Sequence, residues 1–142
     1  APDVHDVRAE DGSRCLLTRY PGGMQGPVLL TYGVGASSLI FALDTVRVTL
    51  LEYLVHAGYD VWLLDDRSSP LLASVNTDYD LDTLADRDLP AAITAATVCS
   101  AIRGSTPSSA AVTCGASANP VSRAAGLDIL FLPNNYLSEI HT

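Results

Sequence analysis

The sequence contains no lysine, so its 8 basic side chains are all arginines, against 16 acidic residues. The net charge of -8 at pH 7 repels phosphate backbones and anionic lipid, which makes nucleic acids and membrane surfaces poor candidate partners. No run of about 20 apolar residues is present, so the sequence predicts no membrane span. Only 17% of the residues are charged and 48% are hydrophobic, which is typical of a soluble domain with a large core.

Cysteine is also scarce. Cys15, Cys99 and Cys114 lie far apart and form no Cys-x-x-Cys pair, so no zinc site, and no other metal site, is expected. Buried free thiols are the favoured interpretation for Cys15 and Cys99, and one disulfide is allowed if the protein is exported. The chain begins with alanine, which fits a processed mature protein or a chain trimmed upstream. A cytoplasmic and an exported location therefore both stay open.

Strand and helix patterns alternate along the chain after an opening hairpin. The Asp11-Gly12 turn predicts a hairpin of residues 4–9 and 13–20. Further strands are expected at residues 28–31, 59–64, 110–114 and 127–132. Helices are expected at residues 45–57 (capped by Asp44), 82–102 (kinked at Pro90 or restarted there with Asp88 as cap) and 120–125. This order predicts a single α/β domain over residues 1–142, with a mostly parallel sheet and an N-terminal antiparallel hairpin.

A glycine turn follows the strand at residues 28–31, and it reads Tyr-Gly-Val-Gly-Ala-Ser-Ser from Tyr32 to Ser38. Its Gly-x-Gly-x-x-Ser form is close to a dinucleotide fingerprint, for which Asp65 would be the ribose-binding acid. The turn follows the third expected strand rather than the first, and serine replaces the last small residue of the fingerprint. We therefore expect no nucleotide and no other cofactor.

The residues around this turn carry a family resemblance. The segments DGSRCLLTRYPGG, GPVLLTYGVGASSLIF, GYDVWLLDDRSS and DLPAAI resemble the N-terminal half of α/β-hydrolases, over residues 11–93. More narrowly, they resemble acid-lipase-like hydrolases and the hydrolase domains fused to cholesterol-oxidase-type proteins. In that family a His-Gly-x-Gly turn forms part of the oxyanion hole, which implies that role for Gly33 and Val34. Tyr32 stands at the histidine position, where it can orient the turn through its hydroxyl or simply pack.

The resemblance also implies a serine nucleophile on a tight turn after the strand at residues 110–114. Gly115-Ala116-Ser117-Ala118-Asn119 follows that strand, so Ser117 is the candidate nucleophile and the Ala118 N–H the second oxyanion donor. Cys114 is the alternative nucleophile. Because a thiol needs a base or a positive environment to ionise and none is evident nearby, a buried cysteine is the favoured interpretation there.

Ser117, Asp128 and His141 occur in the order serine, acid, histidine that the resembling fold uses. Asp128 begins a strand, however, and few residues follow Ser117, so we expect a truncated or compressed α/β-hydrolase fold. The sequence thus predicts a small hydrolase that, if active, cleaves carboxylic esters or lipid-like acyl substrates. The alternative is a non-catalytic fragment or remnant that forms a homo-oligomer through an exposed sheet edge.

Overall fold

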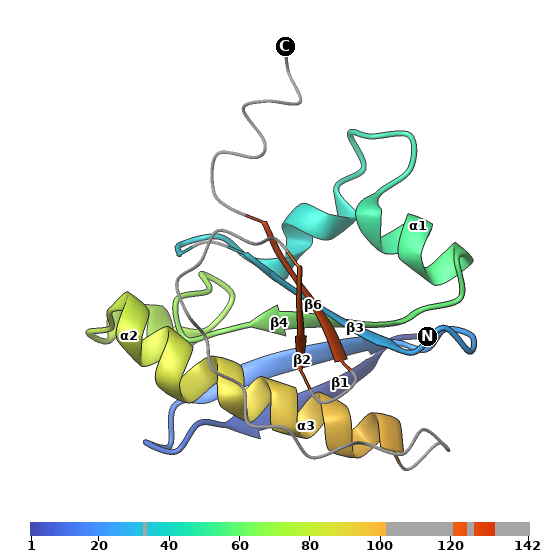
Figure 1. Cartoon of the computed structure of the whole chain (residues 1–142). Helices are drawn as coiled ribbons and strands as arrows, with labels where there is room; N and C mark the ends of the chain where they lie inside the picture. The colour runs from blue at the N-terminus through green and yellow to red at the C-terminus, as the bar shows by residue number, and fades with distance from the viewer. Residues whose placement is uncertain (33, 102–120, 125–126, 133–142) are drawn as a thin grey trace.

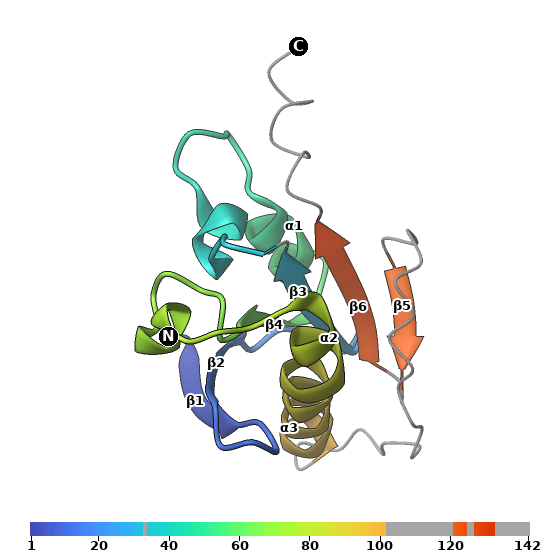
Figure 2. The same ribbon diagram turned by 90° about the vertical axis from the view of Figure 1, so that its left-hand side faces the viewer.

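The computed structural model of the chain describes residues 1–32, 34–101, 121–124 and 127–132. Its strands (Figure 1) form one six-stranded sheet, whose order β1-β2-β4-β3-β6-β5 can be followed in Figure 2. They are β1 (Asp3–Arg8), β2 (Arg14–Tyr20), β3 (Pro27–Tyr32), β4 (Asp60–Asp65), β5 (Val121–Ala124) and β6 (Leu127–Leu132). β3 is parallel to β4 and β6, whereas the three other pairings are antiparallel. The described sheet is therefore mixed, and the prediction of a mostly parallel sheet was wrong in this respect.

Helices cover both faces of the sheet (Figure 2). The long helix α3 (Leu89–Ala101) packs on one face, and α1 (Leu50–His56) with the 3-10 helix η1 (Ser38–Ala42) packs on the other. β4 is buried throughout because it lies between these layers, and its side chains alternate between them. Trp62 and Leu64 join the core under α3, while Val61 and Leu63 join the core under α1.

Most strand predictions are confirmed. The hairpin forms as β1 and β2, and the strands expected at residues 28–31, 59–64 and 127–132 are β3, β4 and β6. The strand expected at residues 110–114 lies outside the described residues. The helix expected at residues 120–125 was wrong, because Val121–Ala124 pairs with β6 as a strand. A helix this short leaves nearly all its backbone groups without intrahelical partners, whereas strand pairing satisfies several of them.

The helix α1 begins five residues later than predicted. Its cap is Thr49, whose side chain accepts a hydrogen bond from the Glu52 N–H, while the Glu52 carboxylate accepts one from the Thr49 N–H. This reciprocal capping box satisfies two backbone donors at once, so the helix starts there and not at Asp44. η1 was not predicted at all.

The second helical region runs without interruption through α2 (Leu81–Thr83), a π-helical turn (Leu84–Asp88) and α3. The Asp80 side chain caps its start by accepting the Thr83 N–H. Pro90 has no N–H to donate, and the wider turn just before it closes with a bond from the Leu89 N–H to the Leu84 carbonyl. Of the two alternatives considered at Pro90, the restart capped by Asp88 was therefore wrong, since Asp88 lies within the continuous helical region and is fully buried. A further 3-10 helix, η2 (Ala73–Asn76), lies in the loop before α2.

Among the described residues, no helix has the length and apolar character that crossing a membrane would require.

Candidate active site

The neighbouring parallel strands β3 and β4 end side by side, because Leu30 lies opposite Leu63 and each strand stops two residues later. The glycine turn, described at residues 34–37, follows β3, and a polar turn (residues 66–69) follows β4. Within the glycine turn, Gly35 has φ +81°, a left-handed conformation that residues with a Cβ rarely adopt. The carboxyl ends of neighbouring parallel strands are where open α/β sheets bind ligands, so these turns form the candidate site.

The Asp65 carboxylate lies at the centre of this site and is only 1% exposed. Its Oδ1 accepts hydrogen bonds from the Tyr32 hydroxyl (3.0 Å), the Ser38 N–H (2.9 Å) and the Ser69 hydroxyl (2.9 Å). Its Oδ2 accepts the Ser38 hydroxyl at 2.5 Å. Tyr32 precedes the glycine turn and Ser38 follows it, so a single carboxylate holds both ends of the turn.

The Tyr32 hydroxyl donates to Asp65 while its ring packs in the core, a contact compatible with the first of the two roles considered for this residue, orientation of the turn. Burial raises the pKa of the Tyr32 phenol well above its usual value, and the nearby Asp65 and Asp66 carboxylates raise it further. The phenol thus stays protonated at neutral pH and remains a hydrogen-bond donor to Asp65. Because both oxygens of Asp65 accept bonds from the protein, this side chain is also unsuited to binding a ribose.

Arg67 connects the turn after β4 to distant parts of the chain. Its guanidinium donates to Asp88 on the helical region (Nη2–Oδ1 2.7 Å) and to Asp11 in the hairpin turn (Nη1–Oδ2 2.7 Å). The Arg67 N–H also donates to Asp88 at 2.9 Å. These contacts fix the turn after β4 to the hairpin turn and to the helical region.

The structure places few of the predicted site residues. Val34 is half-buried in the glycine turn, whereas the other predicted oxyanion and nucleophile positions lie outside the described residues. Those positions are Gly33, Cys114, Ser117, Ala118 and His141. Their roles stay predictions.

Asp128 is described, and its position counts against the role of triad acid. In the parallel pairing of β3 with β6, Asp128 lies opposite Val28, while Leu132 lies opposite Tyr32. Four residues of strand span about 13 Å. Strand register therefore places the backbone of Asp128 toward the amino end of β3, away from the glycine turn.

Sequence reasoning missed the serines that complete the Asp65 network. Ser38 and Ser69 are buried, yet Ser38 is simply the first residue of η1 and Ser69 lies in the polar turn after β4. Their partner Asp65 is distant in sequence from Ser38 and lies on another strand. No local sequence pattern identifies these hydrogen bonds to Asp65, although serine at positions 38 and 69 is compatible with them.

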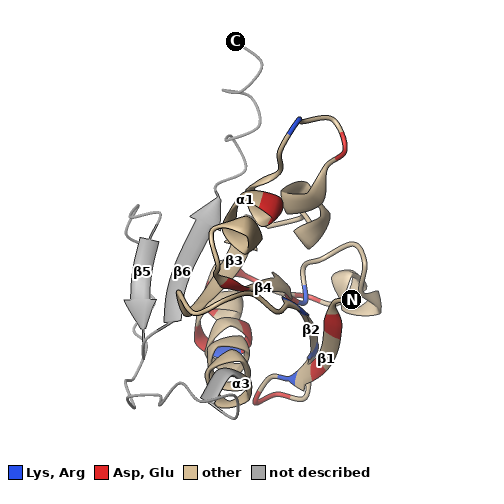
Figure 3. Ribbon diagram, turned by 90° about the vertical axis from the view of Figure 1, so that its right-hand side faces the viewer, with Lys and Arg blue, Asp and Glu red and all other residues tan. Residues whose placement is uncertain are grey.

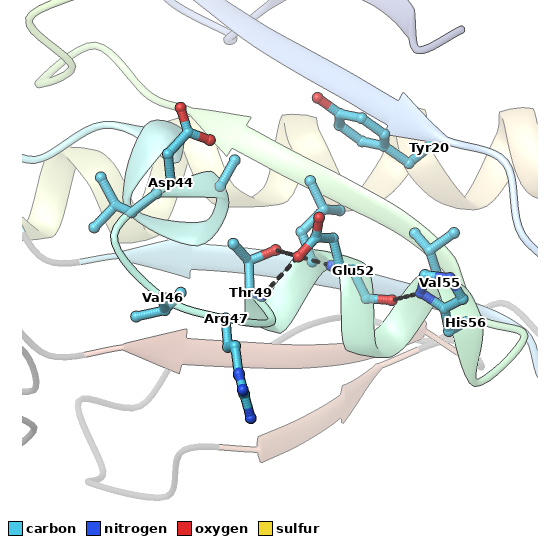
Figure 4. A pocket seen from close by; sticks show the side chains of 11 residues that line it. Tyr20, Asp44, Val46, Arg47, Thr49, Glu52, Val55 and His56 are labelled. Carbon is cyan, nitrogen blue, oxygen red and sulfur yellow. Dashed lines mark hydrogen bonds between the residues drawn. The ribbon is translucent and has the colours of Figure 1, made fainter.

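A separate cavity of about 400 Å³ lies beside α1 (Figure 4). It is bounded by α1, by residues 42–49 and by Tyr20, which lies opposite Val61 near the amino end of β4. This end of the sheet is away from Tyr32 and Asp65. Two of its polar residues are engaged within the helix, because Glu52 belongs to the capping box and the His56 Nδ1 lies 2.8 Å from the Glu52 carbonyl oxygen.

Among the described residues, no group of three or more histidine, cysteine, aspartate or glutamate side chains has an arrangement that could hold a metal ion. No model of a known protein family matches the chain, and no curated protein sequence gives a significant match.

Proposed function

We propose that the protein is a small hydrolase that cleaves carboxylic esters or lipid-like acyl substrates, with the glycine turn as part of its oxyanion hole. The observation that supports this proposal is the attachment of both ends of the turn to the buried Asp65 carboxylate. An oxyanion hole stabilises the tetrahedral intermediate only if its donors are already fixed when negative charge develops on the substrate oxygen. A turn held at both ends meets this requirement.

In the proposed reaction, the Ser117 hydroxyl attacks the ester carbonyl and His141 accepts its proton. The N–H groups of the glycine turn and of Ala118 stabilise the negative oxygen. The carbon–oxygen bond of the ester then breaks, and the alcohol leaves with the proton held by His141. Water hydrolyses the acyl-enzyme, returns the proton to Ser117 and releases the acid. Asp128 has no part in this proposal because of its place in the sheet.

The alternative of self-association through a sheet edge finds little support at β1. This strand forms one edge of the described sheet and carries charged residues along its length (Figure 3), namely Asp3, Asp6 and Arg8. Charged side chains on an edge strand discourage pairing with another chain. We expect light scattering to show a monomer at high micromolar concentration. A dimer that forms as concentration rises would favour the non-catalytic alternative.

The proposed function is tested by treating the purified protein with a fluorophosphonate probe and mapping the adduct by mass spectrometry. We expect an adduct on Ser117, its loss in Ser117→Ala, and its retention in Ser109→Ala, a serine of the same stretch. Ester hydrolysis should also be lost in the variant that loses the adduct, Ser117→Ala, and retained in Ser109→Ala. Absence of both label and turnover on a folded sample would overturn the proposal. Labelling of Cys114 by iodoacetamide with loss of turnover would instead transfer the nucleophilic role to that thiol.

A further inference from the structure

We infer that Asp65 is a positioning residue that determines the conformation of the glycine turn, acting through the Tyr32 hydroxyl before the turn and Ser38 after it. Its effect on catalysis rests on the proposed function, but its effect on the turn does not. Asp65 is therefore assigned a role that can be measured with or without a substrate.

The position of Asp65 is set by the sheet. It is the last residue of β4, which is buried on both faces and paired in fixed register with β3. The side chain has little freedom, because both oxygens accept hydrogen bonds within a site that is almost fully buried. Groups that bind this carboxylate thus take their position from the rigid core.

The glycine turn needs such an external support. Its Gly-x-Gly sequence has little intrinsic conformational preference, and glycine loses more backbone freedom on ordering than any other residue. No regular secondary structure orders residues 34–37, whereas η1 begins immediately after them at Ser38. The bonds from Tyr32 and Ser38 to Asp65 therefore supply order that the local sequence does not.

Tyr32 is well suited to this connection. The side chain is 3% exposed and packs in the core beneath α1 and η1, while its hydroxyl reaches Asp65 at 3.0 Å. A buried tyrosine hydroxyl generally needs such a partner. Phenylalanine would keep the packing and remove only the bond, which makes Tyr32→Phe the most selective variant.

The test is hydrogen exchange, followed by mass spectrometry, of the peptide that contains residues 34–38. Ser69→Ala is the matched control, because it also removes one bond to Asp65 Oδ1 but leaves the turn untouched. After correction for global stability by urea denaturation, we expect exchange of this peptide to be roughly tenfold faster in Tyr32→Phe. Ser69→Ala should match the wild type. Equal exchange in both variants would overturn the inference, because it would leave Tyr32 with a purely structural role.

Asp65→Asn provides a second variant. It replaces one acceptor oxygen with an NH₂ group, which cannot accept the hydrogen bonds that Asp65 receives. We therefore expect faster exchange of residues 34–38 than in Tyr32→Phe. If this variant fails to fold, Tyr32→Phe still decides the question. Exchange at the wild-type rate in a folded Asp65→Asn variant would contradict the inference.

Activity gives a separate readout. If the protein hydrolyses esters, Tyr32→Phe should lower kcat roughly tenfold with KM nearly unchanged, because a misplaced donor weakens binding of the transition state more than binding of the substrate. Tyr53→Phe, at an exposed tyrosine of α1, should leave both constants unchanged. A wild type that neither labels nor turns over would refute the proposed function while the exchange result still stands. Unaltered kcat in Tyr32→Phe would refute the catalytic effect alone.

Discussion

At the residue scale, Asp66 presents a different case from its neighbour Asp65. It is 5% exposed, and its Oδ1 accepts the N–H and the hydroxyl of Ser68. Burial raises the pKa of the Asp66 carboxyl above its usual value, although the two bonds from Ser68 act in the opposite direction. The folded state thus holds the proton more tightly than the unfolded state does. The contribution of Asp66 to stability is therefore greatest at acid pH and is lost as pH rises through the folded-state pKa.

We predict that Asp66→Asn increases the free energy of unfolding at pH 7, because it removes a buried charge and keeps an acceptor for Ser68. The gain should shrink toward pH 4, because the wild-type carboxyl, whose pKa is raised, takes up its proton as pH falls. Urea denaturation at both pH values measures this difference. Asp78→Asn makes the same change of charge at an exposed position and should show no comparable gain. A destabilised Asp66→Asn at pH 7 would mean that the carboxylate is needed in its charged form.

Single-residue roles were only partly predictable. The sequence named Tyr32 and allowed it two roles, but the choice depends on Asp65, which lies 33 positions away. Asp65 was considered as a ribose-binding acid because it ends a strand, and that location was correct. Its inward contacts with Ser38 and Ser69 arise from the pairing of β3 with β4, which no local pattern records.

At the element scale, the start of α1 shows how a local signal can be overlooked. Val46, Leu50 and Leu54 are spaced to share one helical face, and this spacing is compatible with the predicted start at residue 45. The sequence Thr49-Leu50-Leu51-Glu52 is a capping box that could have identified the start correctly. The strand β5 differs from α1 in this respect, because its conformation depends on pairing with β6 rather than on a local sequence signal.

We predict that Thr49→Ala lowers the free energy of unfolding by about 1 kcal/mol, because the Glu52 N–H loses its side-chain acceptor. Asp44→Ala, at the position first expected to cap the helix, should change it by less than about 0.5 kcal/mol, as surface substitutions usually do. Thermal and urea denaturation of the two variants provide the comparison. A larger loss in Asp44→Ala would show that the helix begins earlier than Thr49.

At the scale of the whole molecule, Arg67 joins three parts of the chain that lie far apart in sequence. It connects the end of β4 to the hairpin turn through Asp11 and to the helical region through Asp88. Hydrogen bonds from Arg67 and from the Ser13 N–H lower the pKa of the Asp11 carboxyl to about 2. Since this folded-state pKa lies below the ordinary value, the stability that Asp11 contributes is present above about pH 4 and is lost as pH falls toward 2.

Arg67→Met should therefore affect the whole domain. Asp88 is fully buried, and removing its cationic partner leaves an uncompensated charge, so we expect a loss of about 3–5 kcal/mol at pH 7. The double variant Arg67→Met/Asp88→Asn should recover part of this loss, because the amide oxygen can still accept the backbone N–H of residue 67. Acid unfolding of Arg67→Met should also begin at higher pH, since Asp11 then loses the Arg67 bond, the largest cause of its lowered pKa, and keeps the Ser13 N–H. Urea denaturation from pH 7 to pH 3 tests all three expectations. If the double variant is no more stable than Arg67→Met, the loss reflects Arg67 packing and its bonds to Asp11 rather than the unpaired charge of Asp88.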